Sequence, residues 1–322
     1  MAKIANTVQT YDRKGLREEL ADRIYDISPT KTPFMSNAGR VGAESTFPEW
    51  QVDELEAVDP ANAHVEGNDF TSFDSIGATV RLGNRTQISA KTIIVSRTTE
   101  RVRKAGRKSE MGYQTVRRTK ALKRDIETIA LANQASSAGN GTTARYTGSF
   151  PAFLKTNVSK AGDGTNPSYT TEPNATYSDG TPRNFAESQV KTVMQLCYDN
   201  GGEPTTVMVG SANKINFSSF AGIAEIRKAV DGDGAATIIG AADIYVSDFG
   251  RLAIVPNRFM RAKEAIFVDF DYVKLAFLDD FDIEDLAKTG DAKKKLIICE
   301  WTVKCLNEKA HGIIRDLTTT IN

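Results

Sequence analysis

Alternating hydrophobic and polar positions are clearest near the end of the chain. In KLIICEWTVKCLN, apolar residues occupy every second position at Ile297, Cys299, Trp301, Val303 and Cys305, the period of a strand with one buried face. Six positions along a strand separate Cys299 and Cys305 by about 20 Å, beyond the reach of a disulfide. We therefore expect buried free thiols. Further strands are expected in TTVMVG, EAIFVDF, VKLAFLDD and HGIIRDL, and a hairpin in ADIYVSDFGRLAIVPNR.

Helical periodicity is strongest over residues 109–135. Met111, Leu122, Ile126 and Ile129 fall on one stripe, and three basic residues cluster opposite. At 1.5 Å per residue, this helix would be a rod of about 40 Å with a narrow apolar face. Such a helix is expected to pack on one side only.

Shorter helices are expected elsewhere. Leu16–Ile27 is amphipathic and ends before Pro29, and FAESQVKTVMQLCYD follows Asn184, which with Glu187 resembles a capping box. Two more short helices are expected at Ser211–Phe220 and Ile223–Val230. Helices and strands alternate without βαβ regularity, so the fold class is α+β. Residues 136–183, rich in Gly, Ser, Thr, Asn and Pro, form a candidate boundary between two domains.

Charge is balanced overall but segregated locally. The 322 residues include 41 basic and 41 acidic ones, yet residues 41–80 contain nine acidic residues and no Lys or Arg. Residues 97–135 contain eleven basic residues and four acidic ones. Two strands, in FPEWQVDEL and ATVRLGNRTQIS, flank the acidic segment. This acidic excursion has too few apolar residues for its own core, and isolated hairpins are marginal in water, so it is expected to lean on another surface.

Composition excludes several classes of protein. The hydrophobic share of 40% is too high for a disordered chain, and no apolar run reaches the length of a membrane span. The start, MAKIANTVQTYDRKG, lacks the apolar block of a signal peptide. Zero net charge argues against tight nucleic-acid binding. We therefore expect an intracellular protein with no membrane association.

Catalytic, cofactor and metal motifs are missing from the sequence. With three Cys, two His and no CxxC, a zinc site is not expected; a Cys–His dyad across the fold stays open. No phosphate-binding glycine loop, GxSxG or HExxH occurs. Asp231-Gly232-Asp233-Gly234 lacks the later Glu of a calcium loop and is interpreted as a polar turn. The acidic run Asp279–Asp285 is interpreted as a solvated loop or subunit contact rather than a metal site.

The acidic excursion and the basic helix suggest contacts between copies. A hairpin cannot easily fold back along the helix that it feeds, but it can reach another copy, and such a heterologous contact builds rings or lattices. The alternative is that both are solvated faces, since exposed ion pairs individually contribute little. The candidate contact residues are Glu44, Glu49, Asp53, Glu54, Glu56, Asp59, Arg117, Lys120 and Arg124.

Several segments in order resemble one subfamily of tailed-phage major capsid proteins with the Hong Kong 97-type fold. They are SPTKTPFMSNAGR, KALKRDIETIALANQ, LKTNV, TTVMVGSANKINFSSFAG and ADIYVSDFGRLAIVPNR. The resemblance implies an N-terminal arm at 1–40, an extended β-loop at 41–96 and a peripheral domain at 97–183 with its spine helix at 109–135. It also implies an axial domain at 184–290 and strands returning to the peripheral domain at 291–322.

The implied function is structural. Copies would form hexamers and pentamers of an icosahedral head around double-stranded DNA, assembled in the host cytoplasm, with a portal and a separate scaffolding or decoration protein as partners. Some family members cross-link their shells through a loop Lys, but the first Lys after position 40 here is Lys91. The alternatives are a tail or decoration protein, or an enzyme using Asp279–Asp285.

Overall fold

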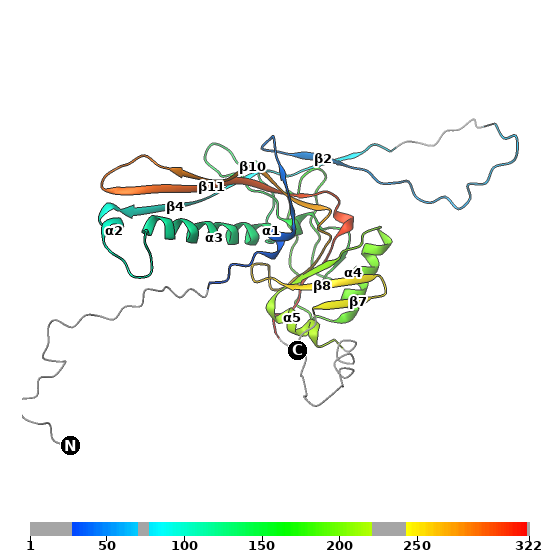
Figure 1. Cartoon of the computed structure of the whole chain (residues 1–322). Helices are drawn as coiled ribbons and strands as arrows, with labels where there is room; N and C mark the ends of the chain where they lie inside the picture. Colours follow the sequence, from blue (N-terminus) through cyan, green and yellow to red (C-terminus); the bar gives the residue numbers. More distant parts are fainter. Residues whose placement is uncertain (1–27, 70–76, 221–242, 321–322) are drawn as a thin grey trace, which may run out of the picture.

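Two β-sheets joined by a shared core form the body of the molecule in the computed structural model (Figure 1). The structure describes residues 28–69, 77–220 and 243–320. The helices expected at Leu16–Ile27 and Ile223–Val230, and the turn expected at Asp231–Gly234, lie outside these residues.

The first sheet has four strands in the order β1-β10-β11-β4. Its strands are β1 (Gly39–Gly42), β10 (Val273–Asp285), β11 (Ala292–Cys305) and β4 (Gln87–Ser96). β11 is the strand expected from its alternation, and its five apolar residues from Ile297 to Cys305 are fully buried. Cys299 and Cys305 are free thiols, as expected. The acidic run Asp279–Asp285 is part of strand β10, so the loop interpretation was wrong, while the interpretation as a subunit contact stays a prediction.

The expected long helix is α3 (Glu110–Ala130), which packs against one face of this sheet. Ser109 caps its start by accepting a hydrogen bond from the Gly112 amide at 3.1 Å. Met111, Leu122 and Ile126 are buried and Ile129 is half-buried, so the predicted stripe is confirmed. The helix ends earlier than expected because Asn133 and Gln134 bond to the loops beyond it.

The second sheet has six strands and carries two helices on one face. Its order is β5 (Val158–Ser159), β12 (Gly312–Ile314), β9 (Ala265–Val268), β6 (Thr206–Val209), β8 (Gly250–Pro256) and β7 (Ile244–Ser247). The covering helices are α4 (Glu187–Asp199) and α5 (Ser211–Ser218), whose buried side chains form a second core with β6 and β8. The expected β7–β8 hairpin is present.

Some local expectations were wrong in detail. Helix α4 begins at Glu187, and its first turn is held by Gln189, whose side chain donates to the Asn184 carbonyl at 2.9 Å, rather than by an Asn184–Glu187 capping box. The candidate boundary at 136–183 contributes buried residues, including a short 3-10 helix, η2 (Phe150–Phe153). Its side chains fill the space between the sheets, which a loop of this composition does not indicate.

Strands that follow one another in the sequence do not always belong to the same sheet. β4 and β10 both pair with β11 in the four-stranded sheet, whereas β12 pairs with β9 and β5 in the other. β4 therefore belongs to the body, although it lies within residues 41–96. The segment that leaves the body is the hairpin of β2 (Glu49–Val52) and β3 (Val80–Gly83), which projects from the end opposite α2 (Arg97–Arg101) (Figure 1).

A buried carboxylate joins three separate parts of the chain. Glu127 on α3 accepts hydrogen bonds from the amides of Phe34 and Met35 in helix α1 (Pro33–Asn37), both at 2.8 Å, and from the Asn257 side chain at 2.7 Å. Glu127 is fully buried, and burial raises its pKa. The segment after residue 28 is thereby fixed to the helix and to the end of β8.

Replacing this carboxylate should loosen the segment around α1. Glu127→Ala leaves three buried donors without an acceptor, at about 1–3 kcal/mol each, so the free energy of unfolding should fall by at least about 3 kcal/mol. Denaturant unfolding measures the loss, and hydrogen exchange at Phe34 and Met35 should rise more than elsewhere. Thr128→Ala, on the exposed side of the same turn, is the control. Equal stability of Glu127→Ala and wild type would contradict this role.

A buried histidine should make stability depend on pH. His311 is fully buried beside Phe150, and burial lowers its pKa to about 3. The folded form therefore keeps a neutral ring where the unfolded chain binds a proton, so stability is lost as pH falls below about 6.5, at about 1.4 kcal/mol per unit. Urea unfolding at pH 7 and 4.5 should show this slope, and His311→Gln should flatten it. An unchanged slope in the variant would refute the assignment.

Candidate assembly surfaces

The segment between β2 and β3 is exposed wherever the structure describes it, over residues 53–69 and 77–79. Leu55 is 100% exposed, Val58 93% and Val65 82%. Large apolar side chains left in water along a projecting segment indicate a surface that another molecule covers. We call this segment the acidic loop.

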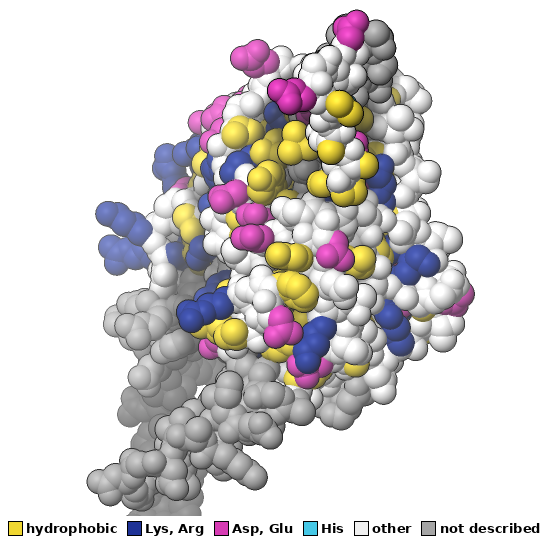
Figure 2. All heavy atoms as spheres, turned by 90° about the vertical axis from the view of Figure 1, so that its right-hand side faces the viewer, with side chains coloured by type: hydrophobic (Ala, Val, Ile, Leu, Met, Phe, Trp, Pro, Cys, Tyr) yellow, Lys and Arg dark blue, Asp and Glu magenta, His cyan; other side chains and the backbone are white. Residues whose placement is uncertain are grey.

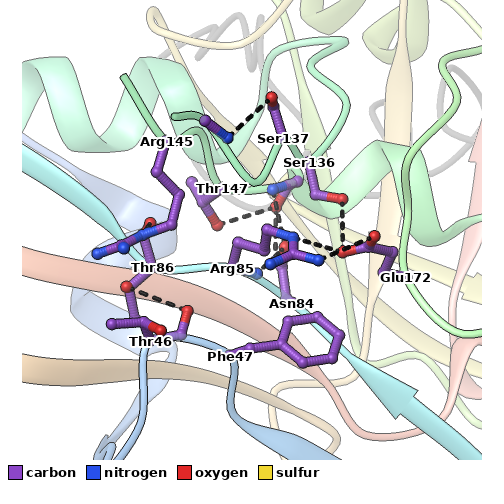
Figure 3. Close-up of polar contacts among 12 residues, drawn as sticks. Thr46, Phe47, Asn84, Arg85, Thr86, Ser136, Ser137, Arg145, Thr147 and Glu172 are labelled. Carbon is purple, nitrogen blue, oxygen red and sulfur yellow. Dashed lines mark hydrogen bonds and ion pairs between the residues drawn. The ribbon is translucent and has the colours of Figure 1, made fainter. Parts of the chain in front are cut away.

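The base of the acidic loop is held rigidly to the body (Figure 3). Asn84, just after β3, is fully buried and donates to the carbonyls of Gly148 and Val303, both at 2.8 Å. Arg85 pairs with Glu172 at 2.8 Å and lies over the Phe47 ring at 4.6 Å. Polar and ring contacts from both strands therefore fix the direction in which the loop leaves.

The two strands at the loop's base are also held to each other and to the body. Glu49 on β2 accepts two hydrogen bonds from Arg81 on β3, both at 2.7 Å. Trp50 packs on Phe153, with 6.1 Å between ring centroids. Beyond the strands, Glu54 pairs with Lys309 at 2.7 Å, in the turn before β12. A groove of about 810 Å³ lies beneath this part of the loop.

The six acidic candidates fall into two groups. Glu49 and Glu54 have the partners just named within the chain, whereas Glu44, Asp53, Glu56 and Asp59 are exposed and form no ion pair within the described residues. Figure 2 shows the end of the molecule from which the loop projects, with acidic and hydrophobic side chains lying side by side on its upper part. Acidic and apolar groups thus share one surface.

The basic candidates lie together on α3. Arg117 and Lys120 are exposed, and Arg124 is half-buried with its guanidinium 5.4 Å from the centroid of the Phe259 ring. A groove of about 380 Å³ runs along these side chains and is bordered by Ser28 and Thr30. We call Arg117, Lys120 and Arg124 the basic stripe.

One chain does not bring the loop and the stripe together. The acidic loop points away from the body at one end, while α3 runs under the four-stranded sheet toward the other end (Figure 1). Within the described residues, Glu49 pairs with Arg81 and Glu54 pairs with Lys309. No carboxylate of the loop or its flanking strands pairs with the stripe there. In that part of the chain, each surface therefore lacks a partner of matching size.

Within the described residues, the structure shows no metal-binding cluster, and no activated thiol at Cys197 or Cys299. No group of three or more potential metal-binding side chains is found there, and Asp279–Asp285 lies extended along β10. Burial raises the pKa of Cys197 and Cys299 to about 12, so neither is a thiolate at neutral pH. None of the described helices is long and apolar enough to span a bilayer.

Sequence reasoning missed the apolar side chains of the acidic loop and the buried carboxylate on α3. The loop's signal was available, because Leu55 and Val58 interrupt a strongly polar run. Glu127 gave no such signal, since a single Glu in a charged helix is normally exposed.

Comparisons with known proteins agree with one another. Residues 3–318 match the family model described as SU10 major capsid protein. A major capsid protein of Escherichia phage Phieco32 is 39% identical over 126 residues, a stretch that spans 39% of this chain and 36% of that protein.

Solved structures extend the likeness to the whole fold. The capsid asymmetric unit of cyanophage A-1(L) superposes with a TM-score of 0.69 at 12% identity, covering 96% of this chain and 98% of that one. The capsid of a native GTA particle gives 0.60 at 14% identity, with the same coverage. This mixed α+β fold thus matches Hong Kong 97-type capsid structures. The chain belongs to the SU10 major capsid protein family, and is a structural, non-enzymatic component of a tailed-phage head.

Proposed function

We propose that this chain forms the hexamers and pentamers of an icosahedral head around double-stranded DNA, assembled in the host cytoplasm. The observation that carries the proposal is the acidic loop, a rigidly based projection whose apolar side chains are exposed. In the proposed domain map, 1–40 is the arm, 41–96 the extended loop, 97–183 peripheral, 184–290 axial and 291–322 the return. The sheets depart from this map at two strands: β10, within 184–290, pairs with β11 in the four-stranded sheet, and β12, within 291–322, pairs with β9 in the six-stranded one.

In the proposed contact, the acidic loop of one copy lies over the basic stripe of the next. Exposed ion pairs contribute about 0.2–1 kcal/mol each. Burying Leu55 or Val58 fully contributes about 1.5–3 kcal/mol each. The apolar side chains therefore supply most of the affinity, while the charges select the partner and its orientation.

Other partners follow from the same role. Basic residues that face the interior would touch packaged DNA weakly and without sequence preference. A portal and a separate scaffolding or decoration protein complete the proposed set; one similar structure, that of the phage G major capsid proteins, also contains decoration proteins. Lys91 lies on β4 and pairs with Asp125, so we propose no lysine cross-link from the loop.

Particle size tests the proposal as a whole. The purified protein should sediment as capsomers or shells and show rounded particles in negative stain. A stable monomer or dimer under all assembly conditions would contradict a shell-forming role.

Charge reversal on the stripe should block assembly while the subunit stays folded. Arg117→Glu with Lys120→Glu places carboxylates opposite the acidic loop, and we expect at least about a tenfold loss of particles, which is about 1.4 kcal/mol per contact. Arg251→Glu with Lys263→Glu, two exposed basic residues of β8 and the segment after it that lie outside this groove, is the matched control. Circular dichroism checks the fold. Shells of normal yield from the double variant would rule out the stripe as the partner.

Replacing the apolar side chains of the acidic loop with polar ones should lower the particle yield independently of the charge reversal on the stripe. Leu55→Asp with Val58→Asp removes the apolar contact without touching the body, since both side chains are exposed. Particle yield should drop at low and high salt alike, whereas the stripe variant should respond to salt. Asn62→Asp, in the same loop, adds charge without removing apolar surface. If it were as damaging as the double variant, charge rather than burial would govern the contact.

A further inference from the structure

The end of the body opposite the acidic loop holds α2 and the last part of β10 (Figure 1). These elements carry a second pair of oppositely charged surfaces. One is the stretch of β10 with the sequence DDFDIED, residues 279–285, which we call the acidic edge. The other is α2 with the turn that follows, residues 97–108, which we call the basic turn and which holds six basic residues and one acidic one. Neither belongs to the loop contact proposed above.

The acidic edge is open on one side. β1 pairs with β10 only at residues 274–277, and within the described residues no strand lies beside the rest of β10 on that side. Two of its five carboxylates pair within the chain, Asp280 with Arg40 at 3.8 Å and Asp285 with Lys295 at 3.2 Å. The other three, Asp279, Asp282 and Glu284, are exposed and form no ion pair in the described part.

Protection of a free strand edge does not by itself explain this pattern. Charged side chains do keep edges from pairing with other chains, but one or two suffice. Five carboxylates in seven positions lie close enough to repel one another, and Asp279 lies directly opposite Glu300 on β11, a like-charge pair that destabilises a sheet. A basic partner would remove that cost. Ile283, 44% exposed among these carboxylates, adds an apolar contact.

The basic turn has the opposite charge to the acidic edge and an exposed apolar side chain of its own. Arg97 pairs with Asp291 at 2.9 Å, but Arg101, Arg103 and Lys108 are exposed and form no ion pair within the described residues. Val102 stands among them, 58% exposed. It lines a shallow groove of about 290 Å³ with Arg97, Thr98 and Arg101. The basic turn thus presents three positive charges that lack ion-pair partners in the described residues, around one exposed apolar side chain.

The two surfaces form no ion pair with each other within the described residues of one chain. The basic turn continues β4 at one edge of the sheet, and the acidic edge lies on β10, with β11 between them. Adjacent strands are about 4.8 Å apart, so the two surfaces face away from each other across the width of three strands. Each is therefore available to another molecule.

We propose that the acidic edge of one copy receives the basic turn of a second copy. Because the two patches differ, the contact is heterologous: each copy offers a free patch to the next, and the series ends only when a ring closes. Asp279, Asp282 and Glu284 would face Arg101, Arg103 and Lys108, with Val102 seated near Ile283. This contact lies at the opposite end of the body from the acidic loop and does not depend on it.

Charge exchange tests the contact directly. The acid variant carries Asp279→Lys, Asp282→Lys and Glu284→Lys, and the base variant carries Arg101→Glu, Arg103→Glu and Lys108→Glu. Each alone should lower particle yield by about tenfold or more, through like-charge repulsion. A chain with all six changes restores complementarity and should recover most of the yield. Asp199→Lys with Glu203→Lys, exposed acidic positions at and after the end of α4, is the matched control.

The outcomes separate this contact from the loop contact. Sedimentation and negative stain report particles, and circular dichroism reports the fold. If wild type forms no particles, the shell-forming role fails. If wild type forms particles and both triple variants do so equally well, the edge contact fails while that role stands. Loss in both triple variants without recovery in the six-fold variant would also overturn the pairing, provided that all the variants are folded.

Discussion

The loop between β2 and β3 has no core of its own, and the rest of the structure accommodates this constraint. A two-stranded ribbon is marginal in water, and here the segment just beyond β2 holds exposed Leu55 and Val58 among carboxylates. The body supports only its base, through the bonds around Asn84 and Arg85. The loop therefore has a fixed direction but an uncovered surface, which suits a segment completed by a neighbour.

The body provides the rigidity that such a projection needs. β11 lies in the middle of the four-stranded sheet, with its apolar side chains from Ile297 to Cys305 fully buried, and it fixes both β4 and β10. Glu127 then joins α3 to α1 and to the end of β8. One buried carboxylate thus couples α1, α3 and the end of β8 in the second sheet. The contacting surfaces are held in constant relative positions, as repeated contacts between copies require.

The sequence predicted the elements that depend on local patterns, but not the features that depend on contacts between residues far apart in the chain. Strand β11 and helix α3 were found because their periods are local and their burial follows from them. The helix ended early because Asn133 bonds to Tyr177, 44 residues away, which no local pattern reveals. The pairing of β10 with β11 likewise places Asp279–Asp285 in a strand against its poor strand propensity. Charge segregation was visible in the sequence, but which carboxylates have partners was set by folding, as Glu54 and Lys309 show.

The central claim is that the acidic loop finds its counterpart on a sister molecule. Disulfide trapping between two differently tagged copies tests it, with Asp59→Cys in one and Lys120→Cys in the other, in a protein whose own three thiols are buried. We expect a disulfide that joins the two tags in assembled particles and is absent from dissociated subunits. Assembled particles in which the two tags never become linked would contradict the claim.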